Sequence, residues 1–466
     1  MVKNTINKLK LLKRKIFTKL IALLVQKEQY IILILLTLLN IKEKKNGKNR
    51  RFFSTPSGKI TILALDSDRY RGDLEVLSSH AGIRVLFMNQ KAPGWLVKSF
   101  YSGLDIPNYI NAEKNSADAI NHKKAYEFMK KFLHKFYQYV SVDCVTTVNY
   151  VYLEDYNWTK ASDVLGVPFI MLYRECLLAS DSLYDRVKAR RVHKFGLHFG
   201  KFHGSHIIVH NDICKQMFID IKYTSADKIT VAGALRMDGF LKLIKQSKNK
   251  KKYTNNKKTF IFFYFPYNSI LFGHKEKKSL GIANIWTNRD KLFSDLHSAV
   301  IELAVEYPNV DFIIKPKKRM VRSRSWGFYQ DVVNKSKVNV KKLSNYRVDA
   351  YLNVSEGIAN ANIICALQSS VVVESAIANK RVIFPLFYNY LSSPHSIEFF
   401  WKNDLELFDV ATNKSDFKRL FKDALDNPNI SKDIQHKRTE LFEKWFGSIR
   451  GDSLNKYYNI IKENIQ

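Results

Sequence analysis

ANIICALQSSVVVESAIANKRVIFP, residues 361–385, is the stretch of the sequence that decides the fold. The apolar runs at 363–367 and 382–385 have the length and composition of buried parallel strands. Between them, Ser369 and Ser370 precede VVVESAIAN, which has room for roughly two helical turns. The stretch therefore predicts a strand, a serine turn, a short helix and a second strand parallel to the first.

The serine turn is also the first candidate binding site. In parallel α/β units, ligands bind where the carboxyl end of a strand meets the amino end of the next helix. Exposed backbone N–H groups there, with the hydroxyls of Ser369 and Ser370, suit a phosphate. Glu374, one turn into the helix, is placed to accept hydrogen bonds from a ribose or sugar diol. The alternative is structural: Ser369 caps the helix and Glu374 balances its dipole.

Length and charge indicate several domains and an anionic partner. At 466 residues the chain is too long for one hydrophobic core, so two domains with appendages are expected. A net charge of +33 implies a membrane surface, a nucleic acid or a phosphorylated substrate, although genomic composition can supply part of the lysine load. Cys144, Cys176, Cys214 and Cys365 lie far apart without a C-x-x-C pair, which fits buried reduced thiols better than disulfides or zinc.

Residues 1–55 are predicted to be a basic amphipathic leader. They carry fourteen basic residues and two glutamates around apolar runs at 20–25 and 30–39. A spanning helix needs about 20 apolar residues, and Lys27 and Glu28 would fall near its middle, where each costs roughly 2.5–3.5 kcal/mol. The many Leu and Ile residues nearly offset that cost, so a spanning helix and a disordered basic tail both stay open. We expect a cytoplasmic protein held peripherally on the anionic inner face of the plasma membrane.

The rest of the chain is predicted to form two Rossmann-like domains, over residues 56–241 and 259–430. Apolar runs alternate with helical stretches in both, which is the pattern of β-α-β units and a parallel sheet. Residues 242–258 are lysine-rich with almost no apolar periodicity, so they are predicted to be the linker. Residues 431–466 are predicted to be C-terminal helices with aromatic anchors.

In the first domain, Glu175 is the candidate general base. It leaves the predicted strand PFIMLY at its carboxyl end, where partial burial would raise the pKa of the carboxyl group into a useful range. Two alternatives are an ion pair between Arg174 and a neighbouring carboxylate, and a helix that starts at Glu175. His210 stands at a similar position after the strand HIIV. Asp66-Ser67-Asp68 matches the D-x-D pattern of metal-dependent transferases, but so short a match is common by chance, and no metal site is predicted.

Two basic segments are candidate sites for anions. Residues 184–203 hold six Lys and Arg residues and three His, which would form a basic rim for an anionic acceptor or, alternatively, a solvated helix face. In the second domain, Lys315-Pro316-Lys317-Lys318-Arg319 follows the predicted strand at 311–314. Its four cations would face the same edge as the serine turn and neutralise a diphosphate, with Lys315 and Arg319 as the donor-binding residues.

Three segments in this order, KITVAGALRMDGF, IIKPKKR and SSVVVESAIANKRVIFP, resemble the GT-B glycosyltransferases. The similarity is greatest to bacterial enzymes of surface polysaccharide biosynthesis, namely capsule and teichoic-acid polymerases of the CDP-glycerol glycerophosphotransferase type and the fold-related UDP-GlcNAc 2-epimerases. Lys315-Pro316, the serine pair and Glu374 carry the resemblance. Many relatives have histidine after the Lys-Pro pair, where this chain has Lys317, so a role for that histidine does not carry over.

The resemblance implies two doubly wound parallel-sheet domains that face a cleft. It also implies a nucleotide-activated sugar or polyol phosphate held by the second domain, a glycan or lipid-linked acceptor against the first, no nicotinamide cofactor and no obligatory metal. In this interpretation Lys315, Arg319 and the serine turn stabilise the departing phosphate. Glu374 holds the ribose, and Glu175 deprotonates the acceptor.

Two other functions stay open. A UDP-sugar 2-epimerase needs the same nucleotide site, but it has no use for a basic membrane anchor. A non-enzymatic, basic nucleic-acid- or membrane-binding protein would also explain the charge of +33. Against a nucleic-acid partner, the basic residues concentrate in the leader and linker, and the sequence has no helix-turn-helix, RNA-recognition or zinc-finger pattern.

Overall fold

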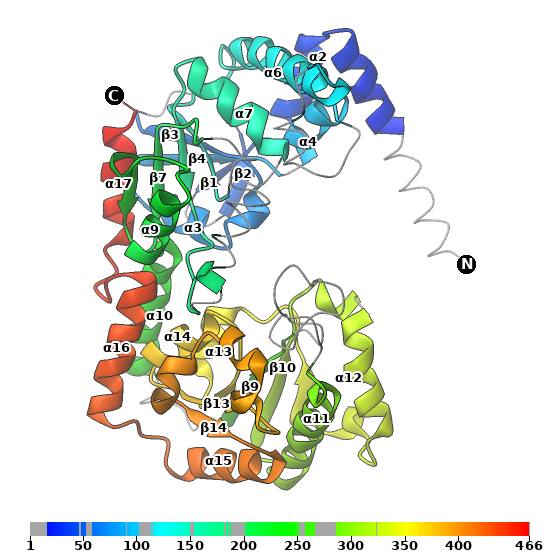
Figure 1. Ribbon diagram of the computed structural model, residues 1–466, viewed down its shortest axis with the longest axis vertical. Helices are drawn as coiled ribbons and strands as arrows, with labels where there is room; N and C mark the ends of the chain where they lie inside the picture. Colours follow the sequence, from blue (N-terminus) through cyan, green and yellow to red (C-terminus); the bar gives the residue numbers. More distant parts are fainter. Residues whose placement is uncertain are drawn as a thin grey trace. The chain divides into compact units, whose positions relative to one another are not determined.

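The chain forms two compact units, each an α/β domain (Figure 1). The first consists of Met1–Cys176, Val187–Gly239 and Arg450–Gln466, and the second of Leu177–Arg186 and Phe240–Ile449. The computed structural model describes residues 16–45, 48–52, 58–89, 91–101, 112, 115–149, 153–180, 183–185, 188, 201–250, 257–265, 286–322 and 324–465.

Within the described residues, the first domain has an eight-stranded sheet in the order β2-β1-β4-β3-β5-β6-β7-β8. The strands from β4 to β8 in this order are parallel, whereas β1 and β2 form an antiparallel hairpin that extends the sheet beyond β4. The bounds are β1 (Lys42–Lys45), β2 (Lys48–Arg51), β3 (Ile60–Ala64), β4 (Ile83–Phe87), β5 (Cys144–Thr147), β6 (Phe169–Leu172), β7 (His206–Val209) and β8 (Ile229–Val231).

Helices cover both faces of this sheet. Side chains alternate along each strand, so Leu63 of β3 lies in one hydrophobic core and Ile62 in another. The core around Leu63 contains residues of α6 and α7, and the core around Ile62 contains residues of α3, α10 and α17. This arrangement confirms the predicted doubly wound fold for the first domain. The bounds are α3 (Asp73–Leu77), α6 (Ala117–Phe136), α7 (Leu153–Val164), α10 (Leu235–Lys250) and α17 (Ser453–Glu463).

The described part of the predicted leader contains two helices followed by the β1–β2 hairpin, and the helices belong to the core of the first domain. Residues 16–26 form one helix and α2 (Tyr30–Leu38) a second, which lies beside α6 (Figure 1). Ile21 and Leu33 are buried in the same core as α6, and the ring of Tyr30 stacks on Phe128 of α6 at 5.5 Å. We expected residues 1–55 to be an appendage outside the two domains. Instead, both helices are apolar on two sides, and one of those sides packs against the core of the first domain. Among the described residues, no helix is long and apolar enough to cross a membrane.

The structure also differs from the sequence at two domain boundaries. Helix α10 continues to Lys250, so the first part of the predicted linker is helical. Within that part Ile244 is buried, three residues after the buried Leu241, a helical spacing that the surrounding lysines obscure. Helix α17 belongs to the first unit: Asp238 accepts hydrogen bonds from the backbone N–H groups of Ser453 (3.3 Å) and Leu454 (2.7 Å) at its start.

The second domain has a six-stranded sheet within its described residues, in the order β11-β10-β9-β12-β13-β14. Every neighbouring pair in this sheet is parallel, as predicted. The short edge strands β11 and β14 were not anticipated. The bounds are β9 (Lys258–Phe263), β10 (Val310–Lys315), β11 (Tyr346–Val348), β12 (Ile363–Cys365), β13 (Arg381–Pro385) and β14 (Asp409–Ala411).

Both faces of the second sheet are covered as well. On β9, Phe260 contacts the ring of Phe421 in α15 (Lys414–Asp426), and Ile261 points the other way, towards Gly357 of α13 (Val354–Asn360). A Cβ on Gly357 would lie 3.3 Å from Ile261, so glycine permits this close packing. The doubly wound fold is therefore confirmed for the second domain too.

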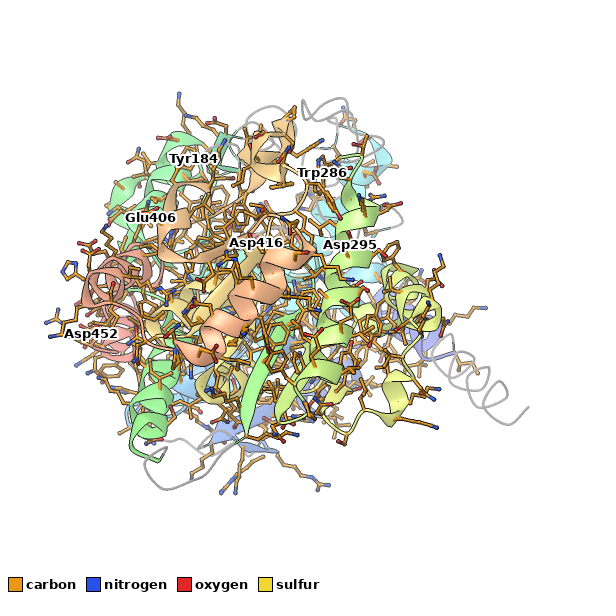
Figure 2. All side chains as sticks on the ribbon, turned by 90° about the horizontal axis from the view of Figure 1, so that it is seen from below. Tyr184, Trp286, Asp295, Glu406, Asp416 and Asp452 are labelled. Carbon is orange, nitrogen blue, oxygen red and sulfur yellow. The ribbon has the colours of Figure 1, made fainter. Side chains whose placement is uncertain are left out.

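Ion pairs join two neighbouring helices of the second domain, α11 (Arg289–Glu306) and α15. Lys414 lies 2.5 Å and Lys418 3.4 Å from the carboxylate of Glu302. Figure 2 shows these helices side by side, with Asp295 on α11 and Asp416 on α15. Because the pairs are only partly buried, each contributes about 0–1 kcal/mol.

His297 of α11 is buried in an aromatic cluster with Phe262, Tyr264 and Tyr329, whose rings lie 5.2–5.5 Å away. Among the described residues, neither of its ring nitrogens has a hydrogen-bond partner. Burial lowers the pKa of His297 to about 3 from an ordinary 6.5. The imidazole is therefore neutral in the folded protein and is protonated in the unfolded chain at mildly acidic pH.

Acid should destabilise the second domain through His297. Because its pKa is lower in the folded state, its contribution to stability is complete above the ordinary pKa of about 6.5 and is lost as pH falls towards 3. We expect His297→Phe to reduce the loss of stability between about pH 7 and pH 4, measured as the shift of the urea midpoint with pH. The same substitution at the exposed His436 is the control. Equal pH dependence in the wild type and the His297 variant would contradict this prediction.

Candidate active site

The serine turn lies where the sequence predicts it, at the carboxyl edge of the second sheet. Strand β12 runs into the turn, α14 (Val371–Ile377) follows, and β13 pairs in parallel with β12, with Cys365 opposite Ile383. The predicted order of strand, turn, helix and parallel strand is thus confirmed. The turn brings two hydroxyls to the amino end of a short helix, at the edge where open parallel sheets bind their ligands.

Within the turn, the second serine faces the glutamate. Ser370 Oγ donates a hydrogen bond to Glu374 Oε1 at 3.0 Å, and Glu374 is 5% exposed. Ser370 occupies the N-cap position without capping the helix through its side chain, and Ser369 Oγ accepts a long hydrogen bond of 3.4 Å from the N–H of Val371. The capping alternative therefore has only weak support. A buried carboxylate bonded to the Ser370 hydroxyl, at the edge where open parallel sheets bind their ligands, is instead suited to polar recognition.

Long-range hydrogen bonds fix the residues just before the turn. The indole N–H of Trp401, which is fully buried, donates to the carbonyl of Leu367 at 3.0 Å. Gln368 donates to the carbonyl of Glu398 and accepts from the N–H of Phe400 at 3.2 Å. These contacts hold the backbone before Ser369 in one position, so the site is preorganised. Sequence reasoning missed them because their partners lie about thirty residues further along the chain.

Lys315 lies at the same edge as the serine turn. It ends β10, which pairs with β9, and β9 pairs with β12, so the turn is two strands or about 10 Å away. Its ammonium group donates to the carbonyls of Pro316 (3.0 Å) and Ala350 (3.1 Å). Burial lowers the pKa of Lys315, Asp349 partly opposes that effect, and Lys318 lowers the pKa further. Lys315 thus braces the loop after β10, whereas Arg319 is exposed and open to an anionic ligand.

In the first domain, the ion-pair alternative for Arg174 is the one observed. Its Nε lies 2.7 Å from Asp73 Oδ2, with both side chains nearly buried, and its Nη1 donates to the carbonyl of Arg69 at 2.6 Å. Glu175 lies three residues beyond the end of β6. We expected its side chain to be partly buried, but it is exposed. The difference arises because Arg174, and not Glu175, turns inward to meet a buried carboxylate.

Two further arginines lie close to Arg174. Arg71 and Arg236 both lie near enough to Arg174 to lower its pKa, although burial is the larger cause and Asp73 raises it. Arg71 has a φ of 47°, a left-handed conformation that is uncommon for a long side chain. Backbone strain of this kind clusters at binding sites. The carboxyl edge of the first sheet therefore combines an exposed carboxylate with several arginines.

The D-x-D segment is held by ion pairs. Asp66 is buried at the end of β3 and lies 2.5 Å from Arg69 Nε, while Arg69 Nη1 lies 3.3 Å from Asp155. Asp68 is exposed. In the part of the chain that the structure describes, there is no group of three His, Cys, Asp or Glu residues that could hold a metal ion.

A cluster around two thiols, at the ends of β6 and β7, was not predicted from the sequence. The N–H of His210 lies 3.4 Å from Cys176 Sγ, Asn211 donates to the carbonyl of Cys176 at 3.1 Å, and the N–H of Cys214 donates to Asn211 at 2.9 Å. Burial raises the pKa of the Cys176 thiol, but hydrogen bonds with Cys214 and His210 outweigh it, so the pKa lies below its ordinary value. The sequence could have indicated this cluster, because both cysteines lie beside loops that follow adjacent parallel strands.

All four cysteines are free and buried, as predicted. Other predicted features lie wholly or largely outside the described residues. These are the basic rim at 184–203, of which the structure describes 184, 185, 188 and 201–203, and residues 251–256 of the predicted linker.

The fold defines a two-domain protein with doubly wound parallel sheets. No protein-family model and no curated protein sequence matches the chain. Solved structures similar to it include UDP-GlcNAc 2-epimerases from Neisseria meningitidis (15% identity, 87% of this chain and 100% of that chain, TM-score 0.45) and Methanocaldococcus jannaschii (13%, 87% and 99%, TM-score 0.47). Another is a UDP-forming α,α-trehalose-phosphate synthase from Burkholderia xenovorans (10%, 88% and 100%, TM-score 0.42). With TM-scores below 0.5, these similarities assign no activity to this chain.

Proposed function

We propose that the protein is a metal-independent glycosyltransferase of the GT-B type. It would move a sugar or polyol phosphate from a nucleotide-activated donor to a lipid-linked or growing cell-surface polysaccharide, such as a capsule, at the inner face of the plasma membrane. The observation that carries the proposal is the buried pair of Ser370 and Glu374 at the carboxyl edge of the second sheet. In open parallel sheets, that edge binds nucleotides, and an acidic residue there holds the ribose hydroxyls.

The donor site would use groups of different character for the two ends of a nucleotide diphosphate. A ribose hydroxyl would donate to Glu374 as Ser370 does, and the phosphates would lie at the serine hydroxyls. Arg319, with its exposed guanidinium, would pair with the negative charge that develops on the departing phosphate. Lys315 would contribute its charge from the base of the loop while it stays bonded to the carbonyls of Pro316 and Ala350.

On the acceptor side, Glu175 would take the proton of the attacking hydroxyl. Its exposure leaves the carboxylate accessible to an acceptor. Two nearby arginines, Arg71 and Arg236, favour an acceptor that carries phosphate or another anionic group. Such an acceptor fits both a lipid-linked glycan and a polyol-phosphate chain.

Incubation with UDP-, CDP- and GDP-linked donors, with and without lipid-linked acceptors, tests this function. Acceptor-dependent release of nucleotide supports a transferase. Interconversion of the donor sugar without an acceptor supports the second candidate, a UDP-sugar 2-epimerase. The burial of Ile21 and Leu33 in the core of the first domain favours that candidate, because it gives the leader a structural role that does not require a membrane. If no donor is released or altered, the protein is a non-enzymatic binding protein and the proposal fails.

Nucleotide binding should depend on Glu374 and Arg319. We expect Glu374→Gln, which keeps the volume of the buried side chain, and Arg319→Ala each to weaken nucleotide binding by about 1–3 kcal/mol, because each loses a charge-assisted hydrogen bond. Calorimetric titration with the nucleotide that the donor screen identifies gives the affinity. Lys341→Ala removes an exposed cation elsewhere in the second domain and is the control. Wild-type affinity in both test variants would show that the serine turn is not the donor site.

A further inference from the structure

The outer side of the two N-terminal helices is apolar and exposed. Within the described residues, sixteen large hydrophobic side chains are exposed, and seven of them lie between residues 16 and 39. Their exposed fractions reach 66% at Ile31 and 80% at Leu39. We call this set the docking face; it consists of Ile16, Leu20, Leu23, Ile31, Ile32, Leu35 and Leu39. Single exposed apolar residues are ordinary, but a concentration of this kind marks an interaction surface.

The spacing of these residues along the two helices shows that the docking face points to solvent and cannot turn into the core. In the first helix, Ile16, Leu20 and Leu23 follow the i, i+4, i+7 pattern of one helix side. In α2 and its C-cap, residues 31, 35 and 39 recur every four residues, while Leu33 and Ile34 are buried in the core against α6. Turning the docking face inward would expose that core. Both sides of each helix are therefore apolar, and only one of them has a partner within the described part of the chain.

Exposed cations follow the docking face directly. Strand β1 begins three residues after Leu39, and the hairpin it forms with β2 exposes five basic side chains. None of these five forms an ion pair within the described residues; they are Lys42, Lys45, Lys48, Arg50 and Arg51. Charges at the free edge of a sheet also prevent strand addition. An apolar helix face beside a basic segment is complementary to a surface that is apolar inside and anionic outside.

We propose that the docking face inserts into the interface of an anionic lipid bilayer, with the basic hairpin against the lipid headgroups. An anionic bilayer is favoured over the other partners that this surface allows. A nucleic acid offers phosphates but nothing to cover seven apolar side chains. A second copy of the chain would cover them, but it brings its own basic hairpin and a net charge of +33 against the first. This proposal does not depend on the reaction that the protein catalyses.

Vesicle sedimentation with the full chain tests the proposal. We expect binding to phosphatidylcholine vesicles that contain phosphatidylglycerol, much weaker binding to phosphatidylcholine alone, and loss of binding in high salt. The triple variant Ile31→Ser, Leu35→Ser, Leu39→Ser should weaken binding at least about tenfold, because three apolar side chains no longer leave water. Its melting temperature should stay close to that of the wild type, since all three side chains are exposed.

A matched control is available in the same domain. Ile120, Tyr139 and Val164 are exposed apolar residues outside the docking face, and their triple serine variant should bind vesicles like the wild type. Substitution of Lys48, Arg50 and Arg51 by Gln should reduce the preference for phosphatidylglycerol. Wild-type binding by the docking-face variant, or equal binding to neutral vesicles, would overturn the proposal. It would also be overturned if light scattering without lipid showed a dimer that the same variant abolishes. None of these measurements uses a donor, so their failure is separate from failure of the transferase assay.

Discussion

Glu175→Gln is expected to lower the rate of transfer by about 10²–10⁴-fold, the usual contribution of a general base. Glutamine keeps the shape of the side chain and removes its ability to take a proton. Because Glu175 is exposed and takes no part in the hydrogen bonds of the buried ion pair of Arg174 with Asp73, the substitution should leave the fold intact. Turnover is measured with the donor and acceptor that the nucleotide screen identifies.

Two unchanged quantities distinguish loss of the base from other damage. The affinity for the nucleotide should be the same in the Glu175 variant, since the proposed donor residues belong to the second domain, and the melting temperature should not move. If turnover is also unchanged, Glu175 is not the base. Asp68, which is exposed, and His210 are then the next groups to test; Asp66 follows them because it is paired with Arg69.

Arg438→Met is expected to destabilise the second domain by about 2–6 kcal/mol. Arg438 of α16 (Lys432–Phe446) is 2% exposed, and its guanidinium donates to the carbonyls of Leu407 (2.6 and 3.0 Å) and Lys380 (2.8 Å). Methionine fills similar space but supplies no donor, so two buried carbonyls lose their partner at about 1–3 kcal/mol each. The urea midpoint measures the loss.

The neighbouring exposed Lys437 gives the control for this prediction. Lys437→Met removes a cation from the same helix without touching a buried carbonyl, so its urea midpoint should match that of the wild type. Arg438→Lys should fall between the two, since an ammonium group keeps the charge but offers a different donor geometry. A wild-type midpoint for Arg438→Met would show that these carbonyls find other donors.

The central parts of both domains could be predicted because each is local in sequence. The strand, turn and helix from Ile363 to Ile377 lie within one short stretch, and their apolar runs are uninterrupted. The edge strands were missed for a physical reason. β11 and β14 have only three residues and are partly exposed, and the β1–β2 hairpin consists almost wholly of charged residues without alternation.

Side-chain partners in the candidate sites were beyond prediction. The position of Lys315 at a strand end follows from the sequence, but its bond to the carbonyl of Ala350 depends on a loop 35 residues away. For the same reason, the inward turn of Arg174 beside the exposed Glu175 could not be foreseen: its partner Asp73 comes from a distant helix. Strand ends locate a site, whereas tertiary contacts decide which of its groups are exposed.

The leader shows that an amphipathic pattern does not tell whether a helix packs on its own domain or on another partner. The sequence placed residues 1–55 outside both Rossmann-like domains, so their deletion would be expected to leave the two domains intact. Since Ile21, Val25 and Leu33 lie in the core of the first domain, that deletion would expose the side of α6 they cover. Substitutions on the docking face are therefore the better test of membrane binding. With a deletion, loss of binding could not be told apart from unfolding of the first domain.

The attachment of α17 to the first domain has a consequence for how the protein is made. Tyr457, Ile460 and Ile461 complete the core beneath β3 and β4, yet they are translated after the whole of the second domain. At about 5–20 residues per second, synthesis of the intervening second domain keeps that core open for roughly ten to forty seconds. A nascent first domain would need a chaperone or ribosome surface to cover it during this time. A nonsense codon between the second domain and α17 would then damage the domain that was translated first.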